Sequence, residues 1–344
     1  MPELHGDPWR SAIPQGSLSP ANQNRLDFVN GSAFQPEAIE FSARVRSDNN
    51  WNRPARFTNG TGGEARYAAD GEIDSLGISL TVPLGKRWAI SLEGSVGLWS
   101  GGWMDGLIED FHRAMGIRDH DRPSGPRDQL RVENGSWTAS ASEGLLGMGT
   151  ARIQWVALQN ARHALALRAD LGLPLGLVQR GVRAGLQLGG GLRYSGRGGR
   201  FQWDLGAGLA GSSPWMDAIE SLTPTPVRFF YDASLTVGLG RGVALVLGHR
   251  FAGPLYREGW TYVPRAGAVG ENEYISSGTA TLFDTRRQFF TALRWDGPRA
   301  SLHLSLVEDL WPGAKPGNLD VVCDGPDLTL GLGGSYRWEV KTRR

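Results

Sequence analysis

The stretch AIEFSARVR, residues 38–46, alternates between apolar and polar side chains. Ile39, Phe41 and Val45 fall on one side of the alternation, whereas Glu40 falls on the other. Successive side chains of a β-strand point to opposite faces, so this pattern predicts a strand with one apolar and one charged face.

Eleven further stretches repeat this alternation, which gives twelve expected strands of nine to thirteen residues. The stretches 130–138 and 274–283 either extend the sheet beyond these twelve strands or add a strand pair, so fourteen stays open as a count. The eleven stretches are 73–82, 88–98, 146–158, 163–171, 183–194, 201–210, 227–239, 243–252, 286–295, 299–309 and 326–338.

Short and long connections alternate along the chain. The short ones are 83–87, 159–162, 195–200, 240–242 and 296–298, and the long ones are 47–72, 99–145, 172–182, 211–226, 253–285 and 310–325. Strands of about ten residues with short turns at one end and long loops at the other are typical of transmembrane β-barrels. We therefore predict an all-β antiparallel barrel with extracellular long loops.

Composition excludes several other classes. No apolar run reaches the roughly 20 residues of a membrane-spanning helix. With 36 basic and 35 acidic residues the chain has a formal charge of +1, which favours no nucleic-acid partner. The single cysteine, Cys323, has no companion for a metal or redox site, and we expect no cofactor. The opening MPELHGDPWR does not resemble a signal peptide, so an exported chain would start after its cleavage site.

Aromatic side chains near strand ends suit the interfacial girdles of a membrane barrel. They are Trp88, Trp99, Trp203, Tyr231, Trp295, Tyr336 and Trp338. We divide the chain into an N-terminal periplasmic segment (1–37), the barrel (38–338) with a helical insert at about 99–145, and a charged tail (339–344). The expected partners are outer-membrane lipid and lipopolysaccharide, the barrel-insertion machinery, and a small solute.

Three segments resemble a family of Gram-negative outer-membrane barrel proteins known only as a domain of unknown function. They are SLSPANQNRLDF (17–28), the block at 103–130 and the closing block at 301–338. The resemblance implies fold and location, with no catalytic residues. The charged VKTRR after Trp338 departs from the aromatic ending that such barrels usually carry.

Alternation assigns many charged residues to the lumen. Arginines that line an open path would favour anionic solutes, whereas arginines paired with carboxylates would close a narrow barrel. The expected lumen residues are Glu40, Arg44, Arg46, Glu93, Arg152, Arg168, Asp170, Arg183, Asp204, Arg228, Asp232, Arg250, Arg294, Asp327 and Arg337.

His303 and Ser305 share one strand face, as in membrane-embedded acyl hydrolases, with Asn318 or Glu308 as a third member. The neighbouring leucines occupy the lipid face, which directs both side chains into the lumen and argues against lipid hydrolysis. The function we expect is a narrow gated or plugged channel, or a loop-presenting surface protein; the alternative is a barrel-embedded hydrolase.

The segment GGWMDGLIEDFHRAMG, 101–116, predicts an amphipathic helix. Its apolar stripe is Met104, Leu107, Ile108, Phe111 and Met115, with Asp105, Glu109, Asp110 and Arg113 facing away. Because the stripe needs a surface to cover, we expect the helix to fold over or into the barrel opening. The nearby DHD at 119–121 offers oxygen and nitrogen ligands but lacks the spacing of a known metal site.

Overall fold

Twelve of the alternating stretches form strands in the computed structural model, which describes residues 31–59, 64–116, 127–134, 137–139, 141–174, 186–212, 225–253, 260–262, 286–312, 319–321 and 328–339. The barrel strands are β1 (Ala38–Asn59), β2 (Glu64–Leu84), β3 (Trp88–Ser100), β7 (Met148–Gln159), β8 (His163–Pro174), β9 (Gln187–Gly198), β10 (Phe201–Ser212), β11 (Val227–Gly240), β12 (Val243–Ala252), β14 (Arg286–Asp296), β15 (Ala300–Pro312) and β17 (Leu328–Glu339).

These strands close into a barrel. Each pairs with its sequence neighbour in antiparallel fashion, and β17 pairs with β1 from Ala38↔Glu339 to Asn49↔Leu328. Closure satisfies the backbone hydrogen bonds of both would-be edges, which a sheet in hydrocarbon requires. The predicted antiparallel barrel of twelve strands is therefore confirmed.

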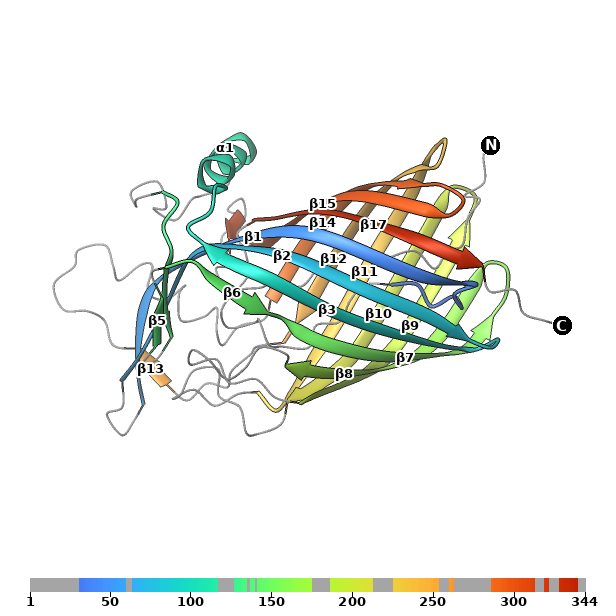
Figure 1. Ribbon diagram of the computed structural model, residues 1–344, viewed down its shortest axis with the longest axis horizontal. Coiled ribbons are helices and arrows are strands. Elements are labelled where there is room, and N and C mark those ends of the chain that lie inside the picture. The colour runs from blue at the N-terminus through green and yellow to red at the C-terminus, as the bar shows by residue number, and fades with distance from the viewer. Residues whose placement is uncertain are drawn as a thin grey trace.

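The two ends of the barrel differ as the sequence indicated (Figure 1). The tight links gather at one end, called here the short-turn end, and the opposite end is called the long-connection end. At the latter, β1 and β2 stay paired as far as Thr58↔Glu64, so the expectation that 47–72 is a loop was wrong. The backbone there continues its ladder instead of leaving the sheet.

Five short strands extend this sheet. They are β4 (Arg131–Asn134), β5 (Trp137–Ala139), β6 (Glu143–Leu146), β13 (Trp260–Tyr262) and β16 (Leu319–Val321). At the long-connection end, β4 pairs with residues 67–70 of β2, and β13 pairs with residues 57–59 of β1. The stretch 130–138 thus extends the sheet without adding a barrel strand, and 274–283 lies outside the described residues.

The wall has an apolar outer face and a polar inner face. On β15, Leu302 and Leu304 are exposed, whereas His303 between them is buried inside. Trp99 was expected in an outer girdle, but it shares the parity of inward residues such as Ser91 and is buried. One α-helix is described, α1 (Asp105–Met115), and no helix in the described ranges has both the length and the hydrophobicity to cross a bilayer.

Candidate functional site

The barrel interior is filled with paired charges. Each of the following expected lumen residues lies inside the wall: Glu40, Arg44, Arg46, Glu93, Arg152, Arg168, Asp170, Asp204, Arg228, Asp232, Arg250, Arg294 and Arg337. Ion pairs join Arg44 to Glu93, Arg46 to Asp48 (2.6 Å), Arg152 and Arg168 to Asp170 (2.6 and 3.1 Å), Arg193 to Asp232 (2.8 Å), and Arg294 to Asp296 (3.0 Å).

Arginines outnumber carboxylates among the described inward-facing side chains. The guanidinium groups of Arg228 and Arg250 both lie over the ring of Phe230, at 5.0 and 5.9 Å from its centroid. Stacking on an aromatic face adds to the stabilisation of each cation. Arginines are thus the more numerous charged side chains in the described part of the interior.

Residues 31–37 enter the barrel at its short-turn end and bind to the inner wall. The backbone N–H of Ala33 donates to Ser195 Oγ (2.7 Å), and Arg193 Nη1 donates to the carbonyl of Gly31 (2.6 Å). Gln35 donates through its backbone N–H to Gln159 Oε1 (2.8 Å) and through Nε2 to the carbonyl of Trp88 (2.7 Å). This segment links the backbone at the start of β3 to inward side chains of β7 and β9 at one end of the barrel.

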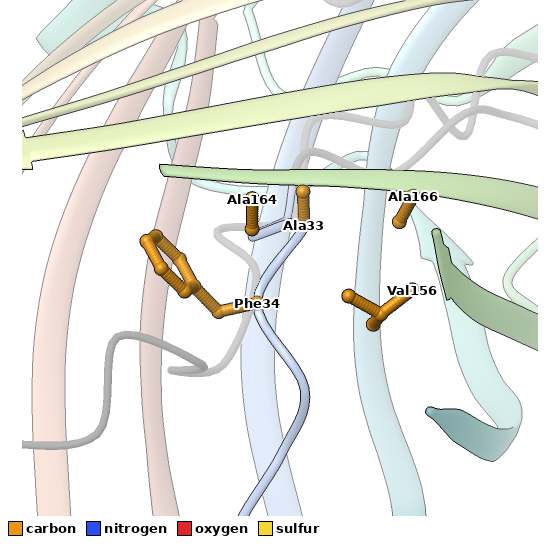
Figure 2. Close-up of a cluster of buried hydrophobic side chains, with 5 residues drawn as sticks. All are labelled: Ala33, Phe34, Val156, Ala164 and Ala166. Atoms are coloured by element: carbon orange, nitrogen blue, oxygen red, sulfur yellow. The ribbon is translucent and has the colours of Figure 1, made fainter. Parts of the chain in front are cut away.

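An apolar cluster completes this contact. Ala33 and Phe34 pack with Val156, Ala164 and Ala166 of β7 and β8 (Figure 2). The guanidinium of Arg197 lies 4.9 Å from the centroid of the Phe34 ring. Sequence alternation gave no sign of this contact, because residues 31–37 have no regular periodicity; the assignment of residues 1–37 to the periplasmic side stays a prediction.

His303 and Ser305 both point into the barrel. The two residues are buried there, with 5% and 4% of their surface exposed. Ser305 Oγ donates to the carbonyl of Gly331 (3.4 Å). Glu308 lies on the outer face and cannot orient His303 from there. Asn318, Arg183, Asp327 and the DHD at 119–121 lie outside the described residues.

Helix α1 lies against the outer wall, not over the opening (Figure 1). Met104 and Ile108 pack against Leu328, with Phe111, Leu306 and Leu330 at the edge of this cluster. Leu306 and Leu330 share their face with the exposed Leu304 and Leu332. The expectation that the helix closes the mouth was therefore wrong: the outer wall offers the apolar surface that the charged lumen lacks.

The buried face of α1 is also rotated from the expected stripe. Asp105, Glu109 and His112 are buried, whereas Leu107 and Met115 are 42% and 61% exposed. Asp105 Oδ1 accepts from Asn49 Nδ2 (3.1 Å), and His112 Nε2 lies 3.6 Å from Glu308 Oε1. Polar partners on the outer wall hold Asp105 and His112, so hydrophobicity alone mispredicts the buried face of the helix.

Glu72 of β2 caps the start of the helix. Its Oε1 accepts hydrogen bonds from the backbone N–H groups of Trp103 (2.8 Å) and Met104. The N–H groups at a helix start have no partner within the helix, so a carboxylate there stabilises it. Gly102 has φ +77°, and a Cβ on it would lie 2.0 Å from Glu72 Cδ, so glycine is required at this approach.

The return segment is clamped to the same helix. Arg127 Nε donates to Glu109 Oε1 (3.2 Å). The backbone N–H of Asp128, the next residue, donates to Asp105 Oδ2 (2.7 Å). The hydrogen bond from Arg127 to the Glu109 carboxylate raises the pKa of Arg127 above its usual value. The chain before α1 is thus held by Glu72, and the chain that returns after α1 is held by Asp105 and Glu109 of the helix.

Comparisons with known proteins give a family and a set of similar solved structures. A family model described as "Protein of unknown function (DUF3187)" matches residues 13–218. No curated protein matches the chain.

Solved structures with similar folds are outer-membrane barrels. The NanC porin has 6% identity and a TM-score of 0.47, with 88% of this chain and 100% of that chain covered. A Pseudomonas aeruginosa FadL homologue has 9% identity and a TM-score of 0.40, with 88% and 91% covered. The P. putida toluene transporter TodX has 9% identity and a TM-score of 0.40, with 90% and 92% covered.

Proposed function

This chain belongs to the family described as protein of unknown function DUF3187, and we propose that it is an outer-membrane channel for small anionic solutes, closed at its short-turn end by residues 31–37. The long-connection end faces the cell exterior in this proposal, as in other barrels with this division of turns and loops. Residues 31–37 then close the periplasmic end.

The position of residues 31–37 carries the proposal. A segment outside the strands lies within the lumen and is held by individual hydrogen bonds and a small apolar cluster, not by a β-ladder. Such a segment can leave without breaking the closed sheet. The surplus of inward arginines supports an anionic solute, because a guanidinium binds carboxylate and phosphate groups through two parallel hydrogen bonds.

Planar-bilayer conductance tests the proposal. Deletion of residues 1–36 removes the plugging segment and leaves all strands intact, so we expect higher conductance than in the full chain. The reversal potential in a KCl gradient should show preference for chloride. A folded deletion form that conducts no better than the full chain would overturn the channel proposal.

A matched control fixes residues 31–37 to the inner wall with an engineered disulfide. Ala33 and Ala164 belong to one buried cluster, so Ala33→Cys with Ala164→Cys, on a Cys323→Ser background, should form a bridge between segment and wall. The oxidised form should stay closed and the reduced form should recover the conductance of the parent. Equal conductance in both forms would show that the segment does not gate the path.

The second candidate is a surface-presenting barrel. β1 and β2 run for 22 and 21 residues and carry β4 and β13 beyond the barrel rim. This observation favours a role for the projecting sheet in contacts outside the cell. Absence of conductance in the full and the deleted chain would make this function the better explanation.

A further inference from the structure

We propose that the groove between α1 and the outer wall binds one acyl chain of a membrane lipid, in the leaflet at the long-connection end. This inference does not depend on channel activity. The groove has a volume of about 660 Å³, within the roughly 300–1,000 Å³ of sites for small ligands. Its walls come from α1 and from the outer faces of β11, β12, β14 and β15.

The groove opens on the apolar band of the barrel. Leu235, Leu247 and Phe289 line it, and all three are exposed on the outer face. The same face of β14 continues through Leu293 to Trp295 at the short-turn end. Hydrocarbon, not water, therefore meets this groove in a bilayer, which selects an acyl chain as its occupant.

Helix α1 distinguishes the groove from the rest of the lipid-facing wall. Phe111 and Met115 stand over the wall and form a side of the groove that no strand supplies. On the opposite side of the helix, Asp110 and Arg113 form an exposed ion pair. A helix with one charged and one apolar side lies in the membrane interface, with its apolar side among the acyl chains.

The polarity of the groove matches the direction of a lipid. Register places Glu308, Phe289 and His249 at one level of neighbouring strands, and Leu306, Thr291 and Leu247 two residues closer to the short-turn end. Glu308 and His249 both line the groove. On β12 and β15 the polar His249 and Glu308 lie toward the long-connection end and Leu247 and Leu306 toward the short-turn end, as the head and the chain of a lipid in that leaflet would require, whereas β14 does not follow this order.

Native mass spectrometry of the full-length, delipidated barrel tests this assignment, with dipalmitoyl phosphatidylethanolamine as the probe. After the probe lipid is added back, we expect the parent to retain one lipid per chain at a collision energy that removes all other bound lipids. Leu247→Trp fills the groove and should lower the retained fraction about tenfold. Leu192→Trp makes the same change on the outer face of β9, which supplies no wall of the groove, and should retain lipid like the parent.

A second pair of variants leaves the strands unchanged. Met115→Asn places an amide in the groove, whereas Leu107→Asn places one on an exposed part of the same helix that does not line it. We expect loss of the retained lipid only with Met115→Asn. No retained lipid in the parent, or equal retention in groove and control variants, would overturn the inference. So would dimers of the parent that Leu247→Trp dissociates, because a second copy would then occupy the groove.

Discussion

Residues 31–37 and helix α1 lie against opposite faces of the same barrel wall. The inner segment is held by hydrogen bonds that its backbone N–H groups donate to Ser195 and Gln159 and that its Gly31 carbonyl accepts from Arg193, because the lumen offers polar groups. The helix is held by Met104 and Ile108 against outward leucines, because the outer face is apolar. The comparison teaches that the chemistry of each face, not the position in the sequence, decides which segment it accepts.

The interior contact should be the more sensitive of the two. Arg193 pairs with Asp232 and also binds the carbonyl of Gly31, and both charged side chains are buried. Arg193→Ala leaves the Asp232 carboxylate without this partner, which we expect to lower the free energy of unfolding by about 3–5 kcal/mol. The shift of the folded barrel on unheated gels, followed against urea, measures this change.

Arg193→Leu combined with Asp232→Leu is the control, because it removes both charges. We expect most of the lost stability to return in this double variant. If Arg193→Ala unfolds at the urea concentration of the parent, the buried pair does not support the wall, and the contrast between inner and outer contacts fails.

The sequence predicted the wall well because a membrane barrel repeats one simple rule. Lipid outside and polar groups inside force period-two alternation on every strand, as in Leu302, His303 and Leu304. The same rule placed inward arginines such as Arg44 and Arg168, but the expected lumen residues omitted Arg193, whose parity opposite Leu192 could have shown it. The girdle assignment of Trp99 went against this rule, since Trp99 has the inward parity of Ser91, and the loop expected along 47–72 is instead a continuation of the β1–β2 ladder.

The two segments outside the alternation could not be placed by the same reasoning. Residues 31–37 bind through backbone groups, which every residue carries, so no side-chain pattern marks them. The buried face of α1 depends on Glu72 and Asn49, which precede the helix by many residues. Only the register of β1 and β2 brings these partners to the helix.

Two glycines flank helix α1, one at a crowded position and one at an open position. Gly102 (φ +77°) faces the Glu72 carboxylate, whereas Gly116 (φ +69°) has no atom within 4 Å of an added Cβ. Gly116→Ala should destabilise the helix by only about 1–2 kcal/mol, from its left-handed backbone. Gly102→Ala should do more, because it also displaces the capping carboxylate.

Hydrogen exchange of the α1 amides measures both changes. Exchange should be faster in Gly102→Ala than in Gly116→Ala, while the urea midpoint of the barrel stays near that of the parent, since α1 lies outside the closed sheet. Equal exchange in both variants would mean that Glu72 does not anchor the helix start.

The smallest effect is expected on the solvent side of α1, where Arg113 Nη1 lies 2.7 Å from Asp110 Oδ1. The two side chains are 71% and 73% exposed, and water screens their attraction. Arg113→Ala should therefore change helix stability by less than about 0.5 kcal/mol, and the α1 amides should exchange at nearly the rate of the parent. Arg113→Lys keeps the charge and serves as the matched control. If Arg113→Ala accelerates exchange as much as Gly102→Ala while Arg113→Lys does not, the helix is held by its surface charge, and the assignment of its anchor to the apolar outer wall is wrong.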